Sequence, residues 1–99
     1  MAEILKRIVI YTKTDCTDSE NSLKVLDALR IKPPFKNERN ISTEPQAMDE
    51  FKQLIKDGRP GTPRILYLEG HSQDRMTVVG ALVEPNDETL AAMVRMIDF

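Results

Sequence analysis

A short apolar run, Ile8–Tyr11, gives way within a few residues to a segment with helical periodicity. A run that is apolar at every position is typical of a strand buried on both faces of a sheet. From Thr17 onward, apolar residues recur on one side of a helix, which Pro33-Pro34 ends. A helical crossover favours a parallel partner for the first strand, joined by a right-handed connection. We therefore expect Ile8–Tyr11 to lie in the centre of a sheet.

The remaining segments each show a helical or a strand-like periodicity. The predicted helices cover residues 18–30, 44–57 and 86–97, and the further predicted strands cover residues 35–42, 64–68 and 76–79. The last two strands are joined by a short turn and predict an antiparallel hairpin. Thr43 and Gln46 match a capping box for the second helix, and Asn86 is a suitable N-cap for the third. This order predicts a mixed four-stranded α/β sheet with helices on both faces, in a single domain spanning residues 1–99.

Composition excludes several classes of protein. The chain has 14 Lys+Arg against 16 Asp+Glu, a net charge of −2, and its basic residues are spread evenly among the acids. This distribution argues against a nucleic-acid partner. Lys6 and Arg7 interrupt the N-terminal apolar run, so it does not read as a signal peptide, and no segment approaches the ~20 apolar residues of a membrane helix. A single cysteine suits a reducing compartment, and we expect a soluble, cytoplasmic domain.

That cysteine, Cys16, stands where the first helix should begin. A thiol there has its pKa lowered by the exposed helix amides, and only the thiolate attacks a disulfide. Lys13 adds positive charge and the Ser19 hydroxyl can donate to the thiolate, whereas Asp15 and Asp18 oppose a second negative charge. We expect a partly exposed thiol with a modestly lowered pKa. The alternative is a small buried hydrophobe, which is what a free cysteine usually is.

Several motifs resemble the glutaredoxins. "VIYTKTDC" resembles their active-site entry, "NISTEPQAMDEFKQL" their second strand and following helix, and "GTPRILYL" the segment that carries the cis-proline of the thioredoxin fold. "TVVGALVEPNDETLAAMV" is closer to the last strand and helix of thioredoxins. The resemblance runs in order from about Arg7 to Ile97 and implies a thioredoxin fold, with a cis Thr62–Pro63 bond in contact with Cys16. The usual Cys-x-x-Cys motif is Cys-x-x-Ser here, ending at Ser19.

The resemblance implies a monothiol thiol-disulfide oxidoreductase. Cys16 would be the nucleophile, with Ser19 beside it, and glutathione or a protein disulfide would be the partner. Lys13 would pair with a carboxylate of glutathione, the Thr62 backbone beside Pro63 would hold an extended ligand, and Gly80 would allow close approach to it. Glutathione is then a co-substrate, and we expect neither a tightly bound cofactor nor a metal.

Other interpretations remain open. Lys13 can be a solvated surface lysine and Gly80 a turn residue that ends a strand; His71 reads as a solvated turn residue. A thioredoxin-fold binding module without turnover, acting on an unidentified protein partner, fits the missing second cysteine. An arsenate-reductase-like enzyme is a lesser alternative, because "CTDSENSLKVL" resembles that family's helix entry but has Glu20 where the family has Arg. Four methionines follow core spacing and are expected to pack: Met48, Met76, Met93 and Met96.

Overall fold

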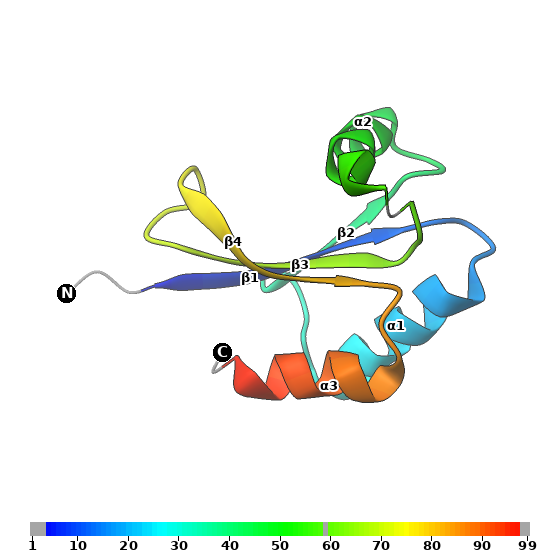
Figure 1. Ribbon diagram of the computed structural model, residues 1–99. Coiled ribbons are helices and arrows are strands. Elements are labelled where there is room, and N and C mark those ends of the chain that lie inside the picture. Colours follow the sequence, from blue (N-terminus) through cyan, green and yellow to red (C-terminus); the bar gives the residue numbers. More distant parts are fainter. Residues whose placement is uncertain (1–3, 59, 98–99) are drawn as a thin grey trace.

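A computed structural model describes residues 4–58 and 60–97 (Figure 1). The elements are, in order, β1 (Leu5–Thr12), α1 (Thr17–Ala28), β2 (Lys36–Asn40), α2 (Pro45–Leu54), the 3-10 turn η1 (Ile55–Asp57), β3 (Arg64–Gly70), β4 (Met76–Val83) and α3 (Asp87–Met96). The four strands form one sheet in the order β2-β1-β3-β4. β1 is parallel to β2 and antiparallel to β3, and β4 is antiparallel to β3. The predicted thioredoxin fold with a central first strand is confirmed.

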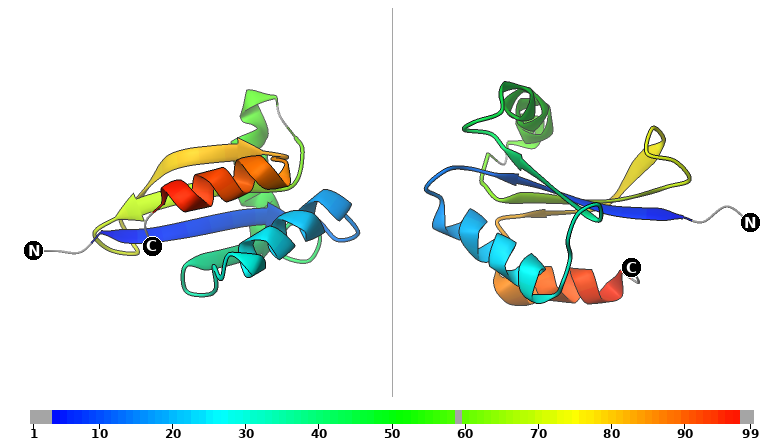
Figure 2. Two further views of the ribbon diagram at one scale, coloured as in Figure 1. Left: turned by 90° about the horizontal axis from the view of Figure 1, so that it is seen from below. Right: turned by 180° about the vertical axis from the view of Figure 1, so that it is seen from behind.

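The helices lie on both faces of the sheet (Figure 2). α1 and α3 contact each other on one face, and α2 lies alone on the other. Ile8 and Ile10 of β1 point to the α1–α3 side and are fully buried against residues that include Leu26 and Leu90. Tyr11 points to the opposite side. Successive side chains of β1 point to opposite faces of the sheet, and helices cover both faces. Each residue of the Ile8–Tyr11 run therefore packs in or against one of the two core clusters.

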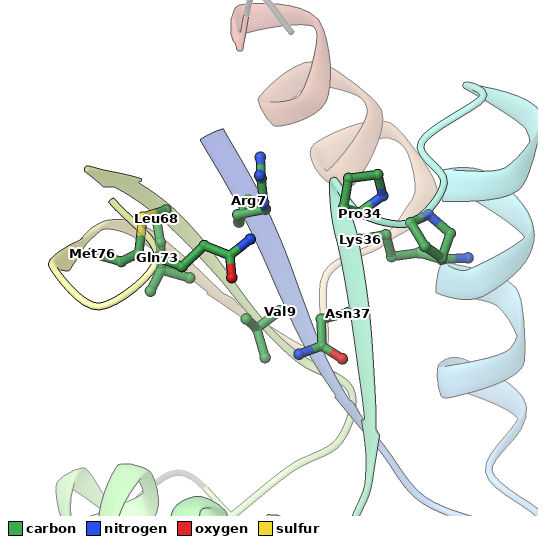
Figure 3. A pocket seen from close by; sticks show the side chains of 9 residues that line it. Arg7, Val9, Pro34, Lys36, Asn37, Leu68, Gln73 and Met76 are labelled. Atoms are coloured by element: carbon green, nitrogen blue, oxygen red, sulfur yellow. The ribbon is translucent and has the colours of Figure 1, made fainter. Parts of the chain in front are cut away.

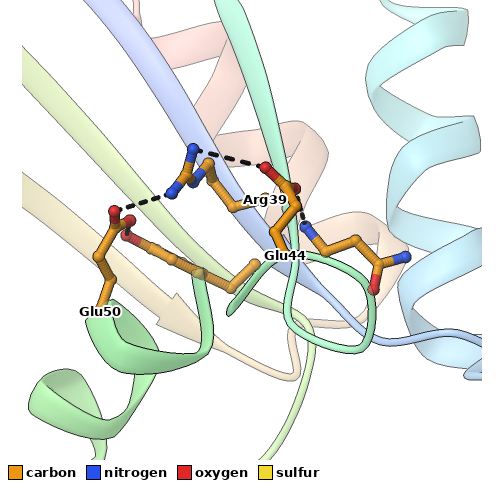
Figure 4. A network of polar contacts seen from close by, with 5 residues as sticks. Arg39, Glu44 and Glu50 are labelled. Atoms are coloured by element: carbon orange, nitrogen blue, oxygen red, sulfur yellow. Dashed lines mark hydrogen bonds and ion pairs between the residues drawn. The ribbon is translucent and has the colours of Figure 1, made fainter. Parts of the chain in front are cut away.

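The second core cluster lies under α2: Tyr11, Ile41, Ala47, Phe51 and Leu66. Arg39 of β2 fastens α2 to this face, because its guanidinium donates to Glu50 Oε2 at 2.8 Å and lies 3.5 Å from Glu44 Oε1 (Figure 4). The Tyr11 hydroxyl donates to the other Glu50 oxygen at 2.9 Å. Burial, and then the hydrogen bond and charge of Glu50, raise the pKa of Tyr11 to about 12.

Three details differ from the sequence-based expectation. The capping box is wrong, because Glu44 is the N-cap of α2 and its carboxylate instead accepts the Asn40 N–H at 2.8 Å. β4 does not end at Gly80 but continues to Val83, since Gly80 pairs with Tyr67 beside a register shift in the ladder. Met96 is 87% exposed rather than packed, because it lies on the side of α3 turned away from the sheet.

The cap of the last helix agrees with expectation. Asn86 Oδ1 accepts the Thr89 N–H at 2.8 Å, which satisfies one amide of the first turn. Asp87 and Glu88 add negative charge to that turn, and this charge interacts favourably with the positive end of the helix dipole. Within residues 4–58 and 60–97, the helices are all too short or too polar to cross a bilayer.

Candidate thiol site

Cys16 is the N-cap residue of α1. Its backbone is extended, with φ −108° and ψ 110°, and its carbonyl accepts the Glu20 N–H at 3.1 Å. The side chain is partly exposed, as expected for a thiol at the start of a helix. Its Sγ lies 3.5 Å from Thr62 Oγ1 and 3.8 Å from the Thr62 carbonyl oxygen. The Thr62–Pro63 peptide bond is cis. Two segments 46 residues apart in sequence therefore meet at the thiol.

The loop between β1 and α1 is held by β2 and the residues that follow it. Thr12 at the end of β1 is buried, and its hydroxyl donates to Glu38 at 2.9 Å. The Thr14 N–H donates to Ser42 Oγ at 3.1 Å, and Asp15 turns the chain with φ 59°. These contacts with the end of β2 fix the position at which Cys16 leaves the loop. The short side chain of Asp15 is one of the few that tolerate the left-handed region.

Ser19 occupies the place of the second cysteine. It is 1% exposed, and its Oγ accepts the Lys13 N–H at 3.3 Å, which leaves the hydroxyl hydrogen available to the thiolate. The Lys13 side chain is exposed. Lys13 is thus joined to the site through its backbone. Its ammonium stands at the surface of the same loop.

Hydrogen bonds lower the pKa of the Cys16 thiol from its ordinary value. The Ser19 hydroxyl contributes most and the Thr62 hydroxyl follows, burial acts against them, and the backbone amides of Ser19 and Asp18 add smaller contributions. The helix amides and Ser19 were expected from the sequence. The Thr62 hydroxyl was missed, although the resemblance already placed the Thr62 backbone beside the thiol. A threonine directly before the expected cis-proline was the available signal.

The Pro63 side of the site is fixed by the end of β4. Pro63 is buried, and its carbonyl accepts the Glu84 N–H at 2.8 Å. Glu84 takes a left-handed conformation with φ 46° to make this contact. Gly80 is not brought here, because it pairs with Tyr67, three residues along β3 from Arg64, or roughly 10 Å. The structure thus gathers Cys16, Ser19, Lys13, Thr62 and Pro63.

A cavity of about 460 Å³ lies elsewhere on the sheet, on the part of its face that α2 leaves uncovered (Figure 3). Arg7, Val9 and Leu68 form its floor, and Asn37, Gln73 and Met76 stand around it. The guanidinium of Arg7 also lies 5.4 Å from the centre of the Phe35 ring. Cys16 is not among the residues that line this cavity. In the described part of the chain, His, Cys, Asp and Glu form no group of three that could hold a metal ion.

A thiol at the start of the first helix, in contact with the loop before β3 at one end of a four-stranded mixed sheet, defines a redox-type site of the thioredoxin fold. The family model for glutaredoxin matches residues 8–71. The chain belongs to the glutaredoxin family.

Relatives with curated names carry a different description. The chain is 30% identical over 71 residues to the global transcriptional regulator Spx of Listeria innocua serovar 6a, and equally so to that of two Listeria monocytogenes strains. The alignment covers 72% of this chain and 52% of each relative. The chain therefore spans about half the length of the curated relatives it matches.

Proposed function

We propose that the protein is a monothiol thiol-disulfide oxidoreductase that acts through Cys16, with glutathione as its thiol co-substrate. The observation that carries the proposal is the environment of Cys16: a partly exposed thiol at a helix start, with the Ser19 and Thr62 hydroxyls arranged to favour the thiolate. The chain holds one cysteine, so exchange must proceed through mixed disulfides. A reducing cytoplasm suits a thiol of this kind.

Exchange takes place in two balanced steps. The Cys16 thiolate attacks the glutathione sulfur of a mixed disulfide, forms a bond with it, and displaces the substrate cysteine as a thiolate that takes up a proton. The thiolate of a second glutathione then attacks the glutathione sulfur on Cys16. Oxidised glutathione leaves and the Cys16 thiolate is regenerated. Together, the mixed disulfide and one reduced glutathione give the free substrate thiol and one oxidised glutathione.

The surrounding residues suit binding as well as activation. Pro63 and the Thr62 backbone would border the bound disulfide, where an extended ligand can pair with main-chain groups. The exposed Lys13 would attract a glutathione carboxylate. Because Asp15 and Asp18 flank the thiol, we expect slow exchange rather than strong activity.

Mass spectrometry after incubation with oxidised glutathione tests the proposal. We expect the native protein to gain one glutathione, to lose it when reduced glutathione is added, and to reduce a glutathionylated peptide over many turnovers. Cys16→Ser is the matched control and should gain nothing. If the native protein stays unmodified, or becomes modified but never turns over, the oxidoreductase proposal is wrong.

The names of the relatives favour a second candidate, a thioredoxin-fold binding module without turnover. Spx is named as a transcriptional regulator rather than as an enzyme. Because the basic residues of this chain are spread evenly, such a role would proceed through a protein partner rather than through direct nucleic-acid contact. Slow alkylation of Cys16 near neutral pH would favour this candidate. An arsenate-reductase-like activity is weaker, since Glu20 stands where an oxyanion-binding arginine would be needed.

A further inference from the structure

Five exposed carboxylates lie in two segments at the thiol site, and we refer to them together as the acidic rim: Asp15, Asp18, Glu84, Asp87 and Glu88. Asp15 precedes Cys16 and Asp18 lies in the first turn of α1. Asp87 and Glu88 form the first turn of α3, which begins beside α1 (Figure 1). Residues from two segments that are distant in the sequence, 15–18 and 84–88, therefore bring negative charge to one place.

A cavity connects two sides of the rim. It has a volume of about 510 Å³ and is lined by Asp18 and Asn21 of α1 and by residues 85–88 at the start of α3. Cys16 does not line this cavity, but Asp18 does and is two residues from Cys16 in the sequence.

Glu84 closes the rim on the Thr62–Pro63 side. Its N–H donates to the Pro63 carbonyl at 2.8 Å, and its side chain folds over Gly61, where a Cβ would collide with the carboxylate. The Glu84 carboxylate is thus held beside the segment that faces Cys16.

Little positive charge offsets the rim. Across the described residues, none of its five carboxylates forms an ion pair within 4.0 Å. Lys13 is the basic residue of the Cys16 loop. The amides of the α3 N-terminus offset part of the charge of Asp87 and Glu88, but only within the first turn. The described basic residues next to the site segments in the sequence are Lys13 and Arg64, so the five carboxylates of the rim leave the surroundings of Cys16 with a net negative charge.

We infer that the disulfide substrate carries positive charge close to its sulfur, as a glutathionylated cysteine flanked by lysine or arginine in a polypeptide does. This inference rests on the proposed exchange reaction and names its substrate class. The negative rim raises the local concentration of a substrate whose basic flanks outweigh the carboxylates of its glutathione, whereas it repels one flanked by further carboxylates. The chemical step is unchanged: Cys16 takes the glutathione, and the basic-flanked thiol leaves.

Three glutathionylated peptides of equal length, with lysine, glutamine or glutamate on both sides of the cysteine, test the inference on the full chain. At about 10 mM salt we expect the native protein to react roughly three to ten times faster with the lysine peptide than with the glutamate peptide. At about 300 mM salt the ratio should fall toward that of free glutathione reacting with the same peptides, which measures their intrinsic reactivity.

Asp87→Asn/Glu88→Gln is the decisive variant, because it removes two rim charges without touching Cys16. It should lose at least half of the lysine preference. Asp49→Asn/Asp74→Asn removes two exposed carboxylates from α2 and the β3–β4 turn and should keep the preference. Circular dichroism and the thiolate titration check that each variant is folded with its thiol unaltered. Glu84→Gln provides a second rim variant if the first does not fold.

The outcomes separate the two proposals. Equal rates with all three peptides, or a preference that both double variants share, overturns the inference and leaves the exchange reaction in place. If no peptide reacts, the exchange reaction itself is wrong.

Discussion

Replacing Ser19 by alanine removes the hydrogen bond that contributes most to the lowered pKa of Cys16. A hydrogen bond to a charged group is worth about 1.5–3 kcal/mol, but water can replace part of it at a partly exposed thiol. We halve the value and expect a rise of about half a unit to one unit in the thiol pKa, since one unit corresponds to ~1.4 kcal/mol. Near neutral pH the thiolate fraction then falls roughly threefold to tenfold.

The ultraviolet absorbance of the thiolate, followed against pH, measures this change directly. The rate of exchange should fall less, by about twofold to threefold, because a thiolate of higher pKa is also a better nucleophile. Ser22→Ala is the matched control: the same substitution at another buried position of α1. If Ser19→Ala leaves the titration where it was, or if Ser22→Ala moves it equally, Ser19 does not tune the thiol.

Three further predictions concern stability. The pKa of Cys16 is lower in the folded state than in the unfolded chain, where it is about 8.5. The thiolate therefore stabilises the fold above the unfolded pKa, and this stabilisation is lost as the pH falls through the folded pKa. The free energy of unfolding, relative to that of Cys16→Ser, should be larger near pH 9 than near pH 6. Tyr11→Phe should lower the free energy of unfolding by about 0.5–1.5 kcal/mol, measured in urea, because the hydrogen bond to Glu50 is lost; an unchanged midpoint would count against that contact. Leu26→Ala, at 0% exposure, should cost about 2–5 kcal/mol, whereas Met96→Ala, at 87% exposure, should cost less than about 0.5; equal costs would contradict the assigned core.

The layout of the fold was predictable because its signals are local. The Ile8–Tyr11 run requires burial on both faces, and the helical segments after it supply the layers that cover them. The end of β4 was not predictable in this way. In the sequence, Gly80 reads as the end of a strand. Within the ladder its backbone conformation is ordinary, and a Cβ added at Gly80 would meet nothing nearer than Tyr67 Cβ at 3.8 Å.

The site was predictable in part. Cys16 and Ser19 follow from helix-start chemistry, and the resemblance led to Thr62 and Pro63. The roles of the Thr62 hydroxyl and of Glu84 depend on contacts between distant segments, which no local pattern encodes. The capping box failed for a related reason: Glu44 rather than Thr43 is the N-cap of α2, and its carboxylate accepts the backbone N–H of Asn40 instead of an amide of the helix.

The pH dependence of Cys16 alkylation tests the central claim most directly. The rate constant for iodoacetamide follows the thiolate fraction, and Cys16 is the sole thiol of the chain. Hydrogen bonds from Ser19 and Thr62 lower the pKa of the thiol and predict a half-maximal rate at a lower pH than that of the same thiol in the unfolded chain. A midpoint at or above that value would show that Cys16 is not a tuned nucleophile, and the binding-module interpretation would replace the oxidoreductase.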